Sequence, residues 1–294
     1  MQDFPFEESR PQERPLDMPS IEKNRCRLII GAIFPFFQKN GSWIPARPEL
    51  VESAIQTYEN LCKKFSRFHI VRTVSDLQKE GTGILLHIEG SDFLSSPEEL
   101  TRWHARGIRS IGLTWNHNNQ FAAGCNGSGG ITQLGEALLA KAESLHLLLD
   151  LVHLNEQSFV EASQFVKRPF MVSHTAIRSL SGHPQALTDN MLDIIAKTQS
   201  IIGFGLLRTF YGHNATAETV AQHIEYARKK MPLQSIALGT DFFGFSPEDG
   251  IPGLKTLDDI TAFGNTLMKK GWTSHAVQQF MGTNAYAFLN TNLA

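Results

Sequence analysis

The chain has 294 residues, of which 41% are hydrophobic and 19% are charged. This length allows one large α/β domain or two smaller ones, and it is ample for a buried core. The 27 basic and 29 acidic side chains give a formal net charge of −2. No basic stripe marks a nucleic-acid or anionic-membrane partner, so a small-molecule substrate is favoured.

The cysteines and the N-terminus indicate the compartment. Cys26, Cys62 and Cys125 are odd in number and lack CxxC spacing, which is typical of reduced thiols in a cytoplasmic protein. Residues 1–20 are polar and acidic, without the basic and apolar regions of a signal peptide. No apolar run approaches the roughly 20 residues that a membrane-spanning helix needs. We therefore expect a cytoplasmic protein without a membrane span.

Residues 1–26 form the first recognisable segment of the chain. They carry four prolines and many charges, which predicts an extended surface segment. The apolar run 27–34 is the first strand candidate. Apolar residues at helical spacing then predict a helix within residues 45–65.

Short apolar runs and amphipathic stretches alternate through the rest of the chain, which predicts one parallel α/β domain over residues 27–294. Further strands are expected at 84–89, 109–114, 147–152, 170–173, 200–207 and 235–240. Helices are expected to start at Ser96, Thr132, Asn155, Thr188 and Thr216, with two more near 257–270 and 274–281. These seven strands are one fewer than a (β/α)8 barrel contains, and we expect the missing first strand to precede residue 1.

Four of the expected strands end in a residue that can bind metal. These residues are Glu89, His153, His174 and Asp241. Because α/β barrels carry their chemistry at the C-terminal ends of the strands, the four side chains are expected at one mouth of the barrel. Two imidazoles and two carboxylates suit a divalent metal ion. His87 shares a strand face with Glu89 but lies deeper, so we expect it in the core.

Several blocks of the sequence resemble the membrane (renal) dipeptidase family of zinc peptidases, family M19, whose members have amidohydrolase-like barrels. The blocks are Glu89-Gly90, GIRSIGLTWNHNNQFAAG at 107–124, LLLDLVHLNEQSF at 147–159, PFMVSHTAIRSLSGHPQALTD at 169–189, SIALGTDFFG at 235–244 and GWTSHAVQQFMGTNAYAFL at 271–289. The resemblance implies a (β/α)8 TIM-barrel-like metallohydrolase that acts on dipeptides. It also implies a small peptide as substrate and a homodimer as the assembly.

The resemblance implies roles for individual residues. Glu89 corresponds to the carboxylate that bridges two zinc ions, and His153 and His174 correspond to the remaining protein ligands of one of them. Asp241 corresponds to the aspartate that handles the proton of the tetrahedral intermediate. In this chemistry the metal pair activates a water as the nucleophile, and one acid/base group protonates the departing amine.

The sequence departs from the family at the His-x-Asp motif, which binds the second zinc ion in family members. Met1-Gln2-Asp3-Phe4-Pro5 lines up with that motif, so Asp3 matches the aspartate while Met1 stands in place of the histidine. We expect two Zn2+ ions per chain if the printed start lies inside a longer reading frame that supplies this histidine and the missing strand. Otherwise we expect one.

Two substrate-binding positions also differ from the family. Trp115 stands where the family has a histidine, with His117 close by, and Gln185 replaces the arginine that grips the dipeptide carboxylate. An amide cannot form the charge-assisted bidentate pair of a guanidinium. Arg178 and His183 are the candidates to replace it.

The sequence therefore favours a zinc dipeptidase and leaves two alternatives open. One is a truncated or catalytically impaired relative that keeps a single metal site, which Met1, Trp115 and Gln185 would favour. The other is a hydrolase of a related small amide or lactone without a free carboxylate, which the loss of the arginine would permit.

Overall fold

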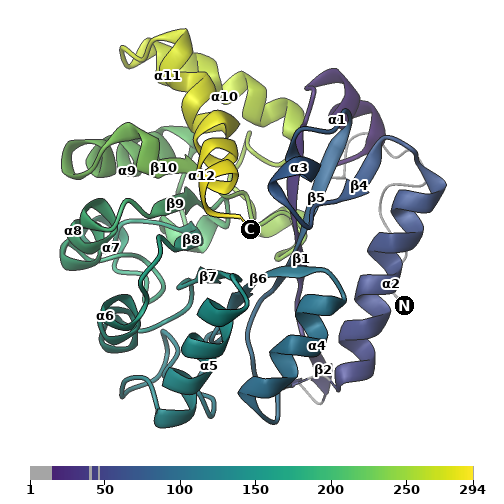
Figure 1. The fold of residues 1–294 in the computed structure, drawn as a ribbon. Coiled ribbons are helices and arrows are strands. Elements are labelled where there is room, and N and C mark those ends of the chain that lie inside the picture. Colours follow the sequence, from purple (N-terminus) through teal and green to yellow (C-terminus); the bar gives the residue numbers. More distant parts are fainter. Residues whose placement is uncertain (1–14, 40–41, 46, 294) are drawn as a thin grey trace. The chain divides into compact units, whose positions relative to one another are not determined.

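A computed structural model describes residues 15–39, 42–45 and 47–293 of the chain (Figure 1). The strands are β1 (Leu28–Ile33), β2 (Phe36–Lys39), β3 (Ser42–Pro45), β4 (Phe68–Ile70), β5 (Thr82–Ile88), β6 (Ile108–Gly112), β7 (Leu148–Asp150), β8 (Met171–Thr175), β9 (Ile201–Phe204) and β10 (Ile236–Leu238). All seven strands expected from the sequence are present.

Helices follow most of the strands. They are α1 (Met18–Lys23), α2 (Pro48–Lys64), α3 (Val74–Leu77), α4 (Leu100–Ala105), α5 (Gln133–Ser144), α6 (Glu156–Phe165), α7 (Arg178–Ser181), α8 (Asp189–Lys197), α9 (Ala217–Lys230), α10 (Leu257–Lys269), α11 (Ser274–Gln278) and α12 (Asn284–Asn292). Short 3-10 helices are η1 (Pro97–Glu99), η2 (Arg208–Phe210), η3 (Leu233–Ser235) and η4 (Pro247–Asp249), and η5 (Gln279–Thr283) is a π-helix. Within the described ranges, no helix has both the length and the apolar character that crossing a membrane requires.

Eight of the described strands form one sheet in the order β1-β5-β6-β7-β8-β9-β10, with β4 paired to β5. Neighbouring strands pair in parallel at β1–β5, β4–β5, β5–β6, β6–β7, β7–β8 and β9–β10. Every residue of β5 is buried, which is expected where a parallel sheet is covered on both faces. Strand β4 and the separate antiparallel hairpin of β2 and β3 were not among the expected elements.

The packing of the chain divides it into two units. One unit is Arg27–Val172 with Tyr286–Ala294, and the other consists of the described parts of Met1–Cys26 with Ser173–Ala285. The boundary falls inside β8, so this strand continues from one unit into the other. The assignment of residues 27–294 to a single domain stays a prediction.

In the Arg27–Val172 unit, helices pack against the strands that they adjoin in sequence. Helix α2 contacts β1 and β4, α4 contacts β6, and α5 contacts β7. The C-terminal helix α12 joins this core through buried apolar side chains, namely Val71, Leu77, Leu85, Leu148, Leu289 and Leu293. These contacts hold the middle of β5 at Leu85 and the start of β7 at Leu148, the two strands that lead to Glu89 and His153.

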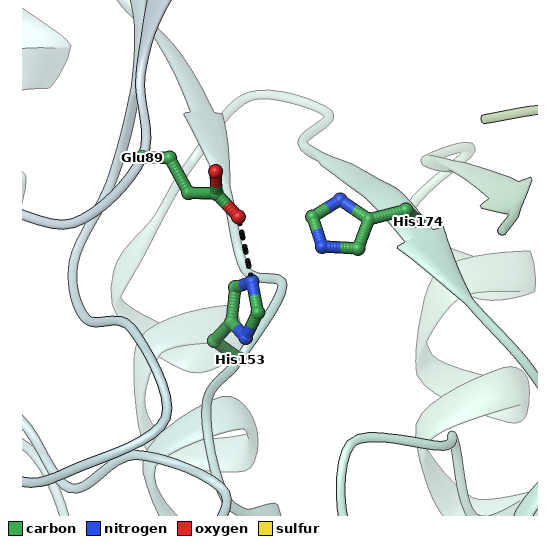
Figure 2. A group of neighbouring side chains, drawn as sticks. All are labelled: Glu89, His153 and His174. Atoms are coloured by element: carbon green, nitrogen blue, oxygen red, sulfur yellow. Dashed lines mark hydrogen bonds and ion pairs between the residues drawn. The ribbon is translucent and has the colours of Figure 1, made fainter. Parts of the chain in front are cut away.

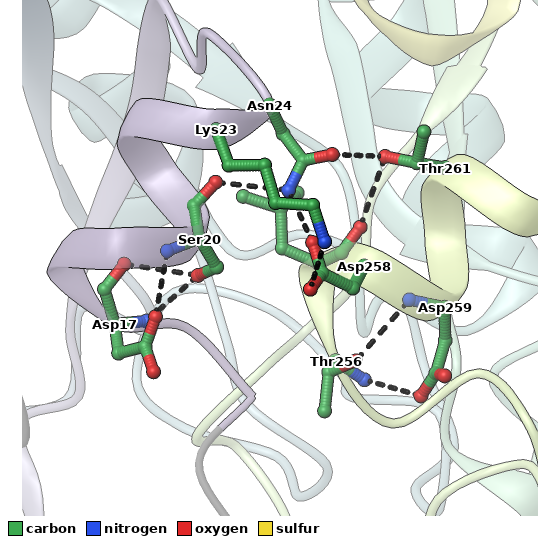
Figure 3. Close-up of polar contacts among 9 residues, drawn as sticks. Asp17, Ser20, Lys23, Asn24, Thr256, Asp258, Asp259 and Thr261 are labelled. Carbon is green, nitrogen blue, oxygen red and sulfur yellow. Dashed lines mark hydrogen bonds and ion pairs between the residues drawn. The ribbon is translucent and has the colours of Figure 1, made fainter. Parts of the chain in front are cut away.

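In the other unit, helix α1 is held against α10 by polar contacts (Figure 3). The Asp17 carboxylate accepts a 2.8 Å hydrogen bond from the Ser20 amide and caps α1. Lys23 and Asn24 both contact the Asp258 carboxylate, at 2.8 and 2.6 Å. The expectation that residues 1–26 are extended is therefore wrong for α1, because this capping box supports a short helix there.

The helix starts were mostly placed well by the sequence. Asn155, Thr188 and Thr216 each accept a hydrogen bond from the first turn of α6, α8 and α9. Ser96 is the N-cap residue of η1 as expected, but its side chain accepts no hydrogen bond from the first turn. The Glu99 carboxylate instead accepts from the amide and hydroxyl of Ser95, one residue earlier.

Candidate metal centre

Glu89 directly follows β5, and its backbone is fixed on both sides. Its amide donates to the Ile33 carbonyl of β1 at 3.0 Å. The next residue, Gly90, has φ of +93°, and a Cβ there would lie 3.0 Å from the Phe36 ring and 3.3 Å from the Trp115 amide nitrogen. Only glycine combines a positive φ with this close packing at low cost. The backbone at Glu89 and Gly90 therefore fixes the position of the Glu89 side chain.

His153 follows β7 in a left-handed backbone conformation, with φ of +65°. For a residue with a Cβ this conformation costs roughly 1–2 kcal/mol. Two contacts hold it: Asp150 Oδ1 accepts from the Val152 amide at 3.1 Å, and the His153 carbonyl accepts from the Cys125 amide. A backbone strain that the surroundings impose is typical of a functional position.

The His153 ring lies between an amide oxygen and a carboxylate. Its Nδ1 is 2.9 Å from Asn116 Oδ1, and its Nε2 is 2.8 Å from Glu89 Oε1. The Cys125 thiol also donates to Asn116 Oδ1, at 3.2 Å, which is consistent with that atom acting as an acceptor. Nδ1 is then a protonated nitrogen, and Nε2 either donates a hydrogen bond to the Glu89 carboxylate or, when it carries no proton, offers its lone pair to a cation.

Two lone-pair acceptors facing each other at this distance repel unless a proton or a metal cation lies between them. The His153 side chain is 4% exposed and the Glu89 side chain 12%, so bulk water does little to screen that repulsion. A histidine whose other ring nitrogen is held by an amide or carboxylate is the usual form of a metal ligand. The Asn116–His153–Glu89 arrangement therefore fits a bound cation.

His174 lies on β8. Its Nδ1 is 2.9 Å from the Ser173 hydroxyl, and its ring stacks on Phe210 with centroids 6.3 Å apart. The Gln185 amide donates to the His174 carbonyl at 3.3 Å. Ligand atoms of Glu89, His153 and His174 all lie within 4.8 Å of one another (Figure 2). One carboxylate oxygen and two imidazole nitrogens form a donor set that zinc accepts.

Of the two aspartates predicted at the site, only Asp241 is among the residues that the structure describes. Asp3 lies outside the described residues. Asp241 follows β10 in a tight turn, with φ of +57°, and its carbonyl accepts from the Gly244 amide at 3.0 Å. A Cβ on Gly244 would lie 2.2 Å from Asp241 Oδ1, so glycine at 244 leaves room for this carboxylate. The acid/base role of Asp241 stays a prediction.

The predicted substrate-binding residues fall into two groups. Trp115 and His117 are in edge-to-face contact, with centroids 6.2 Å apart, and Trp115 is 6.4 Å from the His153 ring. Gln185 and Arg178 instead bond to backbone carbonyls in their own part of the chain: Gln185, 7% exposed, bonds to His174, and Arg178 to Ala186 and Pro184. Both polar groups thus support local structure around β8.

Asn116 was missed by the sequence reasoning, although it lies in the family-like block 107–124, between Trp115 and His117. No spacing rule connects it to His153, because the two are 37 residues apart in the chain. His87, by contrast, is buried as expected. Its Nδ1 is 3.0 Å from the Ser110 hydroxyl, and its Nε2 is 3.4 Å from the Asp150 carboxylate.

Comparisons with known proteins agree with this fold. Residues 3–291 match the family described as membrane dipeptidase (peptidase family M19). The dipeptidase verJ of Clonostachys rogersoniana is 23% identical over 271 residues, which cover 86% of this chain and 68% of that protein.

Two solved structures share the fold. The dipeptidase AC, a metallopeptidase of family M19, superposes with a TM-score of 0.85 at 20% identity and covers 98% of this chain and 92% of its own. A metallopeptidase of Rhodobacter sphaeroides, solved with a phosphinate mimic of the dipeptide L-Ala-D-Ala, gives 0.83 at 18% identity over 96% and 91%. These superpositions confirm the TIM-barrel-like α/β class.

Proposed function

The chain belongs to the membrane dipeptidase family, peptidase family M19, and we propose that it hydrolyses dipeptides with a zinc-activated water. The observation that carries the proposal is the His153 ring, whose Nδ1 lies beside Asn116 and whose Nε2 lies 2.8 Å from Glu89. The phosphinate dipeptide mimic bound by the R. sphaeroides relative supports the substrate class.

Glu89, His153 and His174 are the residues that would hold the metal, with Asp3 contributing to a second ion. When bound there, zinc lowers the pKa of a coordinated water toward neutrality and polarises the scissile carbonyl. Asn116 keeps His153 in the tautomer that offers Nε2. Asp241 takes up a proton and returns it to the departing amine, as the acid/base group of the reaction.

A second candidate function rests on Gln185. Because its amide bonds to the His174 carbonyl, it supplies neither the charge nor the free group that a dipeptide carboxylate needs. This favours a hydrolase of small amides or lactones that lack the carboxylate, or a relative with one metal and little turnover. Dipeptides and their C-terminal amides, assayed side by side, separate these candidates from a dipeptidase.

The proposed function is tested by measuring hydrolysis and zinc content together in His153→Ala and His174→Ala. We expect each variant to lose at least one zinc ion per chain and essentially all hydrolysis. His213→Ala is the matched control, because His213 is exposed and lies after β9 in a surface turn. Full activity in either ligand variant after chelation would overturn the mechanism.

The number of zinc ions, the homodimer and the cytoplasmic location stay predictions. Atomic absorption on the purified wild-type protein gives the number of zinc ions per chain. Sedimentation equilibrium shows whether the protein is a dimer. Two ions per chain would exclude the one-metal alternative.

A further inference from the structure

Three aromatic rings gather within the Arg27–Val172 unit, and we call them the aromatic wall: Phe34, Phe36 and Trp115. The centroids of Phe34 and Phe36 are 4.8 Å apart, and those two rings lie 5.1 and 5.7 Å from Trp115. Phe34 follows β1, Phe36 begins β2, and Trp115 lies in the loop after β6. Three separate segments thus contribute to one apolar surface.

The aromatic wall adjoins both metal-ligand candidates of the same unit. The Trp115 ring is 6.4 Å from the His153 ring. A Cβ on Gly90, the residue after Glu89, would lie 3.0 Å from a Phe36 ring carbon. The aromatic wall therefore lies directly beside Glu89 and His153, and a molecule bound at these two residues would contact it.

The wall is not part of the buried core. Phe34, Phe36 and Trp115 are all partly buried, whereas another aromatic pair in this unit, Phe93 and Trp103, is 7% and 0% exposed. Partly exposed aromatic surface next to a polar centre is typical of a ligand-binding site, where rings bind the apolar part of the ligand and a few polar groups orient it.

We propose that the aromatic wall selects the substrate, by binding a large apolar side chain of the dipeptide. This inference rests on the proposed function and gives it a substrate class: dipeptides that contain phenylalanine or leucine, in preference to those of alanine or glycine. Charged side chains are disfavoured, because the three rings cannot replace the hydrogen bonds that such groups lose on leaving water.

The test compares kcat/KM of the zinc-loaded protein for Phe-Ala, Ala-Phe and Ala-Ala. We expect one of the phenylalanine dipeptides to exceed Ala-Ala by roughly tenfold to a hundredfold, the range given by burying one such side chain. Phe36→Ala and Trp115→Ala should each reduce that ratio at least severalfold. Phe37→Ala is the control, because Phe37 is the next residue of β2 and is 39% exposed.

Three results would overturn the proposal: equal rates for all three dipeptides in the wild type, wall variants that lower every rate by one factor, or a Phe37→Ala effect as large as that of Phe36→Ala. Thermal unfolding identifies a variant that fails to fold. The kcat/KM ratios of the other wall variant then test the proposal.

If the protein hydrolyses no dipeptide, the proposed function fails and binding still tests the wall. Calorimetric titration of the chelated protein should then show Phe-Ala or Ala-Phe binding about tenfold more tightly than Ala-Ala, with the difference lost in Phe36→Ala. Equal binding would overturn the inference.

Discussion

Two buried histidines, one in each packing unit, have opposite environments. His153 is 4% exposed and His223 is 2% exposed, so burial does not distinguish them. The His153 nitrogens lie against Asn116 and Glu89, both of which offer oxygen acceptors. His223 Nδ1 instead accepts the Ile177 backbone N–H at 3.0 Å, and its ring packs on Tyr211 with centroids 4.7 Å apart.

This difference shows what each histidine can do. Burial lowers the pKa of His223 to about 4, so its ring is neutral near pH 7, and its Nδ1 lone pair is used by the backbone of the segment after β8. His153 Nε2 faces a carboxylate, so a proton or a metal cation fits between the two groups. The partner atoms, and not the burial, separate a histidine that completes the fold from one that offers a ligand.

The largest expected effect comes from removing the charge beside His153. Glu89→Gln keeps the side-chain shape but gives His153 Nε2 a neutral partner and weakens the metal site. We expect kcat/KM to fall roughly a thousandfold or more, with loss of bound zinc. Glu80→Gln is the control, since Glu80 is exposed just before β5. Wild-type zinc content and activity in Glu89→Gln would show that this carboxylate is not a ligand.

The pH dependence of stability probes the other histidine. The folded pKa of His223 is about 4 and the unfolded value about 6.5, so between these values the unfolded chain binds more protons. The free energy of unfolding therefore falls as the pH drops from 6.5 to 4, by about 3 kcal/mol in total from this group. Above pH 6.5 its contribution is complete.

Urea unfolding from pH 7 to pH 4 measures this slope in the wild type and in His223→Gln, whose side chain can still accept from Ile177 and does not titrate. The variant should lose less stability than the wild type over this range. Identical slopes would show that His223 is not the titrating group.

A smaller effect is expected at Asn116. Asn116→Ala removes the acceptor of His153 Nδ1, so the ring is free to rotate or change tautomer. Loss of such a supporting partner lowers metal affinity about tenfold to a hundredfold, measured by zinc titration against a competing chelator. Asn118→Ala is the control in the same loop, where the amide donates to the Ser128 carbonyl. An unchanged zinc dissociation constant in Asn116→Ala would argue against the tautomer mechanism.

The sequence predicted the parts of the fold that depend on local patterns. Apolar runs and their end residues placed Glu89 and His153 after β5 and β7, because strand periodicity and chain order determine those positions. Strand β4 was missed because three residues with a histidine in the middle make too weak a signal. The hairpin of β2 and β3 was missed although Asn40-Gly41 between them is a recognised turn signal.

The parts that could not be predicted depend on contacts between distant segments. Asn116 contacts His153, which lies 37 residues further along the chain, and the Phe36 ring of the hairpin lies beside Gly90, which follows β5. The resemblance to the family placed Gln185 at a substrate position, and that role stays a prediction. The hydrogen bond of its side chain to the His174 carbonyl depends on how the segment after β8 folds back, which residue type alone does not determine.

The most direct test of the central claim is anomalous diffraction at the zinc edge from crystals grown with zinc. We predict an anomalous peak within bonding distance, roughly 2.0–2.2 Å, of His153 Nε2, a Glu89 carboxylate oxygen and a His174 ring nitrogen. A zinc peak elsewhere in the chain, or none beside these three side chains, would contradict the account.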